Sequence, residues 1–409
     1  MFLRAVGLVL PAFLVAGCSY FTWLPFINES ESDKNPREPT KLVEFEQEAS
    51  IKRLWHTKVG KGLGRKYLRI SPAVVADRIY AADAYGAVEA LDRFTGKRIW
   101  QTRIGEIDGK PFYEFWDRRD PSFVAGGVGA GGGRILIGTT RGEVIALDAG
   151  TGEELWRTFV YSEILSKPAA NDDVVVAQTS DGRLVALESE DGTERWSFDS
   201  QVPVLTLRGT AAPVVASGLV YAGFATGMVS AVRVDNGEPI WQHRIMLPEG
   251  RSELERMADV DGTPLIGRGV LFAASYQGRV KALRRSDGVP LWELDASSYL
   301  DLAEGYGQLY LVDADDVITA LEQSNADVVW EQSSLRYRRL TSPLAFSNYV
   351  VVGDADGYLH VMAQSDGRFI ARRKIDGKGL RSAMITADSV IYLITNSGQL
   401  EALEIRHEG

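Results

Sequence analysis

Short apolar runs separated by polar turn residues recur along this chain. Between residues 73 and 100 there are four of them, at 73–75, 79–81, 88–91 and 98–100. Aspartate, glycine and threonine stand between the runs, where the chain has to bend. Runs of this length between turn signals are typical of β-strands and too short for helices. The pattern therefore predicts one unit of four short strands.

The same unit returns at a fixed internal spacing. Six times a glycine, or one aspartate in its place, is followed fourteen residues later by tryptophan. The six tryptophans are Trp100, Trp156, Trp196, Trp241, Trp292 and Trp330, and two further copies begin at Gly357 and Gly398 without reaching a tryptophan. Four antiparallel strands repeated about every 45 residues are typical of propeller blades. Eight copies predict an all-β fold, an eight-bladed β-propeller with four-stranded antiparallel blades.

The last copy is incomplete, since only six residues follow Leu403 and no outer strand fits there. An unassigned apolar run at 51–55 precedes the first complete copy. We expect residues 51–58 to supply the missing strand of the eighth blade, because an open ring would leave two unpaired sheet edges. The predicted propeller spans residues 50–409.

The first residues have the pattern of an export signal. Arg4 is followed by an apolar run at 6–15 that is too short to span a membrane, and small residues precede Cys18. This arrangement resembles the bacterial lipoprotein processing site, which implies a signal peptide at 1–17 and acylation of Cys18. Ser19 after the cysteine implies export to the periplasmic face of the outer membrane. Residues 18–49 are then expected to include a flexible tether; an ordinary signal peptide with a chance cysteine is the alternative.

Composition removes several classes of function. The net charge of −10 argues against a nucleic-acid partner. Four histidines without metal-ligand spacing, and a single cysteine, predict no zinc site. The acidic segments 313–316 and 354–357 are interpreted as capped turns between strands and not as calcium loops. We predict no catalytic residues, no metal and no cofactor.

Two further segments are interpreted as loops. The glycine-rich run at 126–133 lacks the Lys-Ser/Thr pair of a phosphate-binding loop, so we expect a slack connector. The densest basic segment, 336–339, is expected to be a solvated loop.

The repeated sequence at 90–100 and 146–156 resembles the tryptophan-docking repeats of quinoprotein dehydrogenases. That resemblance implies an eight-bladed propeller, and in those enzymes pyrroloquinoline quinone and calcium lie on its axis. The disulfide between adjacent cysteines that covers their quinone is impossible here, and no Cys-x-x-Cys-His haem motif occurs. A repeat that packs blades reports the fold and not the activity, so a dehydrogenase is the less favoured alternative.

The length of the repeats varies only between one blade and the next. In an up-and-down blade, these connectors lie on the same face as the turn between the two middle strands. The expanded connectors at 101–127, 197–212 and 242–263 are therefore expected on one face, where binding residues concentrate. A purely structural alternative has Leu205 and Leu207 starting the next inner strand and Arg208 pairing with Asp259 or Asp261.

Four segments resemble the BamB family, the lipoprotein subunits of the outer-membrane β-barrel assembly machinery of Gram-negative bacteria. They are 205–209 (Leu-Thr-Leu-Arg-Gly), 258–264 (Ala-Asp-Val-Asp-Gly-Thr-Pro), 340–343 (Leu-Thr-Ser-Pro) and 352–360. The resemblance implies a non-enzymatic scaffold that docks onto the periplasmic domains of the barrel-forming subunit, BamA. The residues implied to contact BamA are Leu205, Leu207, Arg208, Asp259 and Asp261.

Two other partners stay open at this point. Unfolded outer-membrane proteins could pair with the same connectors through an exposed strand edge. Aromatic residues in the first expanded connector, Phe115 and Trp116, leave room for a periplasmic carbohydrate or peptidoglycan binder.

Overall fold

The computed structural model describes residues 37–407, apart from 67, 106–119, 201–202, 204, 208–210, 248–250 and 253–256. The chain divides into two compact units, residues 1–38 and 39–409, and the fold described below belongs to the second. No helix in the described part of the chain is long and apolar enough to cross a bilayer.

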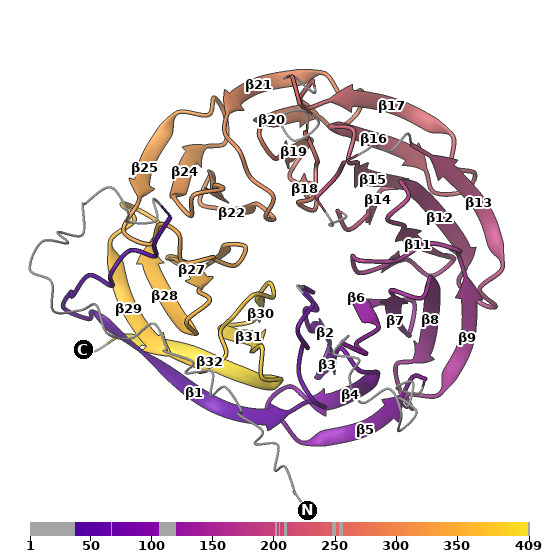
Figure 1. Ribbon diagram of the computed structural model, residues 1–409, viewed down its shortest axis with the longest axis horizontal. Coiled ribbons are helices and arrows are strands. Elements are labelled where there is room, and N and C mark those ends of the chain that lie inside the picture. The colour runs from indigo at the N-terminus through magenta and orange to yellow at the C-terminus, as the bar shows by residue number, and fades with distance from the viewer. Residues whose placement is uncertain are drawn as a thin grey trace, which may run out of the picture. The chain divides into compact units, whose positions relative to one another are not determined.

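The second unit consists of eight four-stranded antiparallel sheets arranged around a central axis (Figure 1), which confirms the predicted eight-bladed propeller. From inner to outer strand, blade 1 contains β2 (Ala73–Val75), β3 (Arg78–Ala82), β4 (Ala87–Asp92) and β5 (Arg98–Arg103), and blade 2 contains β6 (Val124–Gly131), β7 (Arg134–Thr139), β8 (Glu143–Asp148) and β9 (Glu154–Phe159). Blade 3 contains β10 (Ala169–Ala170), β11 (Val174–Gln178), β12 (Arg183–Glu188) and β13 (Glu194–Asp199), and blade 4 contains β14 (Val214–Ala216), β15 (Leu219–Gly223), β16 (Met228–Arg233) and β17 (Pro239–Arg244).

The remaining blades follow the same order. Blade 5 contains β18 (Leu265–Ile266), β19 (Val270–Ala274), β20 (Arg279–Arg284) and β21 (Pro290–Asp295), and blade 6 contains β22 (Ala303–Gly305), β23 (Gln308–Val312), β24 (Ile318–Glu322) and β25 (Val328–Gln332). Blade 7 contains β26 (Leu344–Phe346), β27 (Tyr349–Gly353), β28 (Tyr358–Ala363) and β29 (Phe369–Lys374), and blade 8 contains β30 (Ile385–Ala387), β31 (Val390–Ile394), β32 (Gln399–His407) and β1 (Ala49–Lys58).

The ring is closed by strands from opposite ends of the chain. β1 pairs antiparallel with β32 from Ala49–His407 to Lys58–Gln399, with one irregularity between Arg53 and Trp55. In Figure 1 the indigo β1 lies along the outside of the yellow β32. The expectation that residues 51–58 complete the eighth blade is confirmed.

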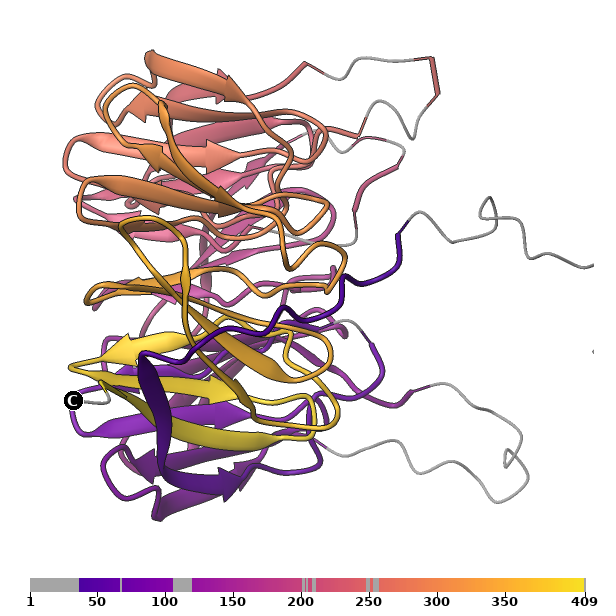
Figure 2. The same cartoon turned by 90° about the vertical axis from the view of Figure 1, so that its left-hand side faces the viewer.

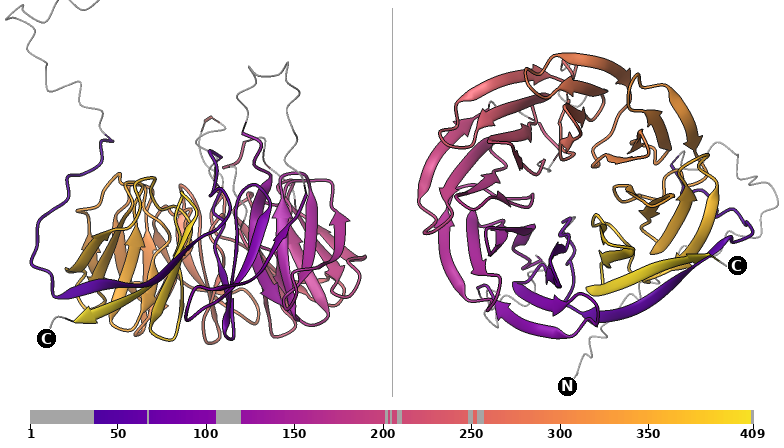
Figure 3. Two further views of the ribbon diagram at one scale, coloured as in Figure 1. Left: turned by 90° about the horizontal axis from the view of Figure 1, so that it is seen from below. Right: turned by 180° about the vertical axis from the view of Figure 1, so that it is seen from behind.

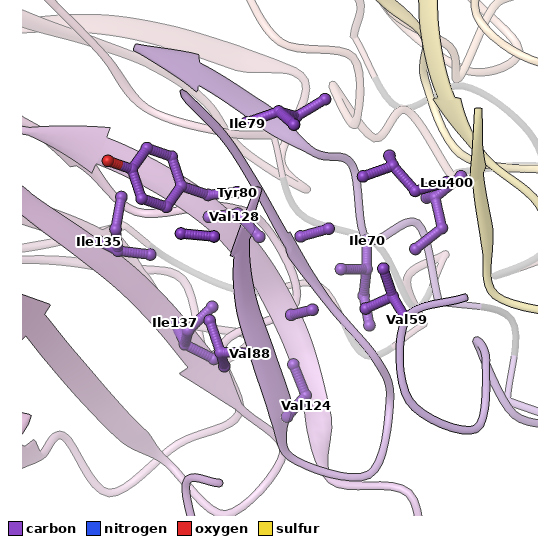
Figure 4. Close-up of a cluster of buried hydrophobic side chains, with 14 of the residues drawn as sticks. Val59, Ile70, Ile79, Tyr80, Val88, Val124, Val128, Ile135, Ile137 and Leu400 are labelled. Atoms are coloured by element: carbon purple, nitrogen blue, oxygen red, sulfur yellow. The ribbon is translucent and has the colours of Figure 1, made fainter. Parts of the chain in front are cut away.

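The core lies between neighbouring sheets. Val88 of blade 1 packs with Val124 and Ile137 of blade 2, and Leu400 of blade 8 belongs to the same cluster (Figure 4). At the outer rim, the indole Nε1 of seven tryptophans donates to a carbonyl in the next blade's turn between its third and outer strands. The pairs are Trp55–Arg93, Trp100–Ala149, Trp156–Ser189, Trp196–Val234, Trp241–Arg285, Trp292–Gln323 and Trp330–Gln364. The repeated tryptophan is thus the contact that joins one blade to the next.

The glycine-rich segment corrects one expectation. Residues 124–131 are not a slack connector; they form β6, the inner strand of blade 2. A Cβ atom on Gly129 would lie 2.2 Å from the carbonyl oxygen of Pro168, and one on Gly126 would lie 2.3 Å from that of Ser166. Glycine is required because the backbone entering blade 3 passes this close. The connector between blades 1 and 2 therefore covers 104–123 and not 101–127.

The N-terminal part of the second unit also differs from the expected tether. Residues 39–48 precede β1 and pack along blade 7, where the amide of Glu48 donates to the carbonyl of Ile370 at 2.9 Å. The tether was expected to extend to residue 49, whereas the compact unit begins at Pro39.

Candidate functional site

The described parts of the expanded connectors lie on one face of the ring, together with the turns between the middle strands of each blade. The amide of Val260 donates to the carbonyl of Phe224, which begins the middle turn of blade 4. The amide of Tyr276, in the middle turn of blade 5, donates to the carbonyl of Asp259. We call this side of the ring the connector face; it lies on the right in Figure 2 and at the top of the left panel of Figure 3.

Two of the residues expected in the docking surface are in direct contact. The backbone amide of Leu207, between blades 3 and 4, donates to Oδ2 of Asp259, between blades 4 and 5. Asp259 is fully buried, and its Oδ1 has no hydrogen-bond partner among the described residues. Its carboxylate therefore lies beneath the leucine connector and holds it in place.

Leu205 is the most exposed of the described residues in the predicted contact set, with 41% of its surface accessible. The inner strand of blade 4 begins only at Val214. The structural alternative, in which Leu205 and Leu207 start that strand and are buried, is therefore wrong for Leu205, and Leu207 is only partly buried. A large exposed apolar side chain on a connector is available to a partner.

Leu247 is a second exposed leucine that the sequence analysis did not single out. It lies between blades 4 and 5 and is 59% exposed. It follows Met246, whose side chain reaches the middle turn of blade 5 at Gly278, so it belongs to the connector face. Little in the sequence favoured the selection of Leu247, because no charged residue follows it directly, as Arg208 follows Leu207.

Burial changes the acidity of the two aspartates. It raises the pKa of Asp259 to about 6, although the hydrogen bond from the Leu207 amide opposes the shift. Burial and the charge of Asp259 raise the pKa of the partly exposed Asp261 to about 7, and the nearby guanidinium of Arg69 opposes that shift. The pair carries less negative charge near neutral pH than two free aspartates would.

Arg69 approaches these aspartates from the connector between blades 8 and 1. Its Nη1 donates to the carbonyl of Tyr299 at 3.3 Å, and its guanidinium lies 5.2 Å from the centre of the Tyr299 ring. Tyr276 packs edge-on against Tyr299, with ring centres 6.3 Å apart. Connectors from far-apart blades therefore meet beside Asp259 and Asp261.

A buried polar cluster at blade 7 corrects the interpretation of 336–339 as a solvated loop for Arg338, whereas Arg336 and Arg339 are exposed as expected. Arg338 is buried, and its Nε donates to Oδ2 of Asp354 at 2.8 Å. The same carboxylate oxygen lies 3.0 Å from Nε2 of His360, while Nε of Arg372 donates to His360 Nδ1. Since Nδ1 accepts, the imidazole is neutral with its proton on Nε2, and burial lowers the pKa of His360.

The acidic turns behave as the sequence predicted. Oδ1 of Asp354 accepts from the amide of Tyr358, and Oδ1 of Asp313 accepts from the amides of Asp315 and Val317. Among the described residues, no group of three or more His, Cys, Asp or Glu side chains is arranged to hold a metal ion.

Several predicted residues lie outside the described part of the chain. They are Cys18, the proposed acylation site; Arg208, in the predicted contact set; and the aromatic pair Phe115 and Trp116.

Comparisons with known proteins agree on one family. The family described as "outer membrane protein assembly factor BamB" matches residues 86–332 and, in an overlapping match, 282–408. The BamB protein of Pseudomonas aeruginosa is 42% identical over 94% of this chain and 97% of its own length. That of Yersinia pestis is 38% identical over 97% of both chains, and that of Escherichia coli 36% identical over 95% and 96%.

Solved structures give the same fold. The crystal structure of BamB from Moraxella catarrhalis matches with a TM-score of 0.76 at 27% identity, over 87% of this chain and all of that one. A quinohemoprotein alcohol dehydrogenase from Comamonas testosteroni matches with a TM-score of 0.67 at 15% identity, over 86% of this chain and 76% of that one, a likeness of fold alone. With full-length relatives at this level of identity, the chain belongs to the BamB family of outer membrane protein assembly factors.

Proposed function

We propose that this chain is a non-enzymatic scaffold lipoprotein, held by an acylated Cys18 at the periplasmic face of the outer membrane. It docks through its connector face onto the periplasmic domains of the barrel-forming subunit, BamA, and so assists the folding and insertion of outer-membrane proteins. The relatives that support this role are named assembly factors and match nearly the whole chain. The proposal depends above all on the Leu207–Asp259 hydrogen bond, which joins two connectors into one surface with Leu205 exposed on it.

The expected mechanism is binding without bond chemistry. Burying an exposed leucine side chain against a partner stabilises a complex by roughly 1.5–3 kcal/mol, and a few such anchors dominate most interfaces. Asp259 contributes indirectly: its carboxylate fixes the backbone at Leu207, so Leu205 is presented in one position before the partner arrives. Asp259 is thus a positioning residue, because it is too deeply buried to be the main contact.

Co-purification from membranes tests the proposal. The full-length lipidated chain with Leu205→Ser should lose at least about tenfold of its binding to the barrel-forming subunit, corresponding to the burial of one leucine. Leu155→Ser is the matched control, because Leu155 is 46% exposed on the outer strand of blade 2, away from the connectors. Undiminished co-purification of the Leu205 variant, or an equal loss in both variants, would rule out this face as the docking surface.

A further inference from the structure

One of the eight junctions between blades lacks the repeated tryptophan. At blade 7 the equivalent position is Ala371, which pairs with Val361 as Trp330 pairs with Ala320 in blade 6. In the other junctions the indole reaches a turn between the third and outer strands of the next blade. Blade 8 has no such turn, because β32 and β1 come from opposite ends of the chain.

Residues 39–48, which we call the strap, run along the outer strand of this blade. Phe45 stacks on Phe369 of β29, with ring centres 5.3 Å apart. The amide of Glu48 donates to the carbonyl of Ile370, and the Glu48 carboxylate accepts two hydrogen bonds from Arg368, at 2.9 and 3.0 Å. The strap therefore lies against β29, and its final part adjoins the junction without a tryptophan.

The accessibility of Ile370 on β29 shows that the outer strand of blade 7 is covered where the outer strands of other blades are exposed. The residue before the tryptophan is an exposed apolar side chain in six blades: Leu54, Ile99, Leu155, Ile240, Leu291 and Val329 are 40–48% accessible. Ile370, in the same position of blade 7, is 2% accessible and packs in a cluster with Ala49 and Ile51 at the start of β1.

Two arginines of the buried cluster in blade 7 hold the strap by its backbone. Nη1 of Arg338 donates to the carbonyl of Thr40 at 2.9 Å, and Nη1 of Arg372 donates to the carbonyl of Val43 at 2.7 Å. The guanidinium of Arg372 also lies 4.9 Å from the centre of the Phe45 ring. Asp354 holds Arg338 in place and His360 holds Arg372 in place through hydrogen bonds. Residues of blade 7 therefore position both arginines for contact with the strap.

The strap changes the face on which the chain leaves the ring. β1 begins at Ala49, opposite His407 at the end of β32 that lies away from the connector face. Thr40, in contrast, is hydrogen-bonded to the carbonyls of Ser334 and Arg336, in the connector between blades 6 and 7. In the left panel of Figure 3 the indigo strap descends from the connector face to the start of β1.

We propose that the strap is a docking device that makes the N-terminal segment leave the propeller from the connector face, beside blades 6 and 7. The lipid anchor at Cys18 and the docking connectors then restrain the same side of the ring; this consequence rests on the proposed function. If the strap were released, the segment between Cys18 and the propeller would lengthen from residues 18–38 to 18–48. Length alone would then lower the effective concentration of the docking surface about twofold.

Distance measurements between spin labels test the strap itself without any partner. Cys18 is the only natural thiol, so Cys18→Ala leaves the full-length chain free for paired labels. One label replaces Pro39; the second replaces Ala355, exposed in the middle turn of blade 7, or Ser365, exposed in the turn at the opposite end of that blade. We expect narrow distributions, with the Pro39–Ala355 distance the shorter.

The variant pair for this test lies within the strap. Leu42→Ser with Phe45→Ser should broaden both distributions, because it removes the two apolar contacts to blades 6 and 7. Val43→Ser should leave both narrow, since that side chain is exposed. Broad distributions in the unmodified strap, or a shorter Pro39–Ser365 distance, would overturn the proposal.

A second measurement separates the strap from the docking surface. In vesicles that hold the barrel-forming subunit, the strap variant should weaken docking at least about twofold when the chain is lipidated and leave docking of the Cys18→Ala chain unchanged. Leu205→Ser should weaken docking in both forms. Equal losses of the strap variant in both forms, or none in either, would overturn its role in tether exit. Unchanged docking of the Leu205 variant would instead reject the proposed function and leave the distance result standing.

Discussion

Closure of the ring by the N-terminal strand makes Trp55→Ala the most informative single substitution. Trp55 is 9% exposed, and its indole packs against Tyr392 of blade 8 and against the turn of blade 1. A Cβ atom on Gly96 of that turn would lie 2.5 Å from Cε3 of the indole, so nothing larger than glycine fits there. The substitution leaves a cavity at the tryptophan contact between blade 8, which holds both chain ends, and blade 1.

The expected loss is dominated by packing. Truncating a buried tryptophan to alanine costs about 3–5 kcal/mol of the free energy of unfolding. The hydrogen bond from Nε1 to the carbonyl of Arg93, at 2.8 Å, adds little, because the hydroxyl of Tyr392 also donates to that carbonyl at 3.2 Å. Trp55→Phe, which keeps most of the packing and loses the hydrogen bond, should therefore cost only about 1 kcal/mol.

Urea denaturation followed by far-ultraviolet circular dichroism measures these differences, since that signal comes mainly from the backbone and every variant keeps most of it. Trp156→Ala is the matched control: Trp156 makes the same contact between blades 2 and 3, with its Nε1 on the carbonyl of Ser189. Losses of similar size at both positions are expected if β1 closes the ring in solution. A loss below about 1 kcal/mol for Trp55→Ala, beside a full loss for Trp156→Ala, would refute closure by the N-terminal strand.

Four further substitutions test the site and the packing. The raised pKa of Asp259 means that the folded chain binds more protons than the unfolded chain between pH 3.8 and about 6, so stability falls as pH rises through that range. Asp259→Asn should abolish this part of the dependence in denaturation midpoints and keep the Leu207 hydrogen bond through its amide oxygen; an unchanged profile would contradict the assignment. Gly96→Ala should cost about 1–3 kcal/mol by overpacking, whereas Ala326→Gly, at the equivalent turn of blade 6 with φ of 65°, should change stability by less than about 1 kcal/mol. Asp354→Ala should cost about 3–5 kcal/mol, because it removes the buried carboxylate shared by Arg338 and His360 and leaves Arg338 only the more exposed Asp356; a loss near zero would show that Asp356 alone satisfies this arginine.

Most of the fold could be predicted from spacing alone. The fourteen residues from glycine to tryptophan span the third strand, a turn and the start of the outer strand, and the contact of each indole with the next blade requires that this length stay constant. The missing outer strand after Leu403 and the orphan run at 51–55 were visible for the same reason. Closure by β1 was expected because an open ring would leave unpaired sheet edges that are prone to aggregation.

The glycine-rich strand β6 could not be predicted from local sequence. Glycine has low strand propensity, and its presence at Gly126 and Gly129 is explained only by carbonyl groups from blade 3 about forty residues later. The same limit applied to Arg338. Its local sequence is basic and polar, and its partners when buried come from elsewhere in the chain: Asp354, Asp356 and the carbonyl of the distant Thr40.

The role of Asp259 shows a similar limit at the candidate site. Sequence patterns and family resemblance both pointed to this residue, yet neither distinguishes a side chain that faces a partner from one that supports the residue that does. Burial decides between these roles, and burial depends on how the connectors of blades 3, 4 and 5 fold over one another. Arg208 and Cys18 stay predictions.

The blade contacts also explain why docking residues gather on one side of the ring. Because every tryptophan must reach the next blade's turn, insertions within the conserved part of a repeat would break a junction, and length can change only between blades. The up-and-down order of strands puts all of these connectors beside the middle turns. Loop length can therefore vary on the connector face but not on the opposite face. The exception to the tryptophan rule, Ala371, follows from closure by β1, because a strand from the far end of the chain brings no turn to receive an indole. Closure by β1 also requires the chain to enter this strand from the face opposite the connectors. The strap leads the chain from the connector face to this starting point.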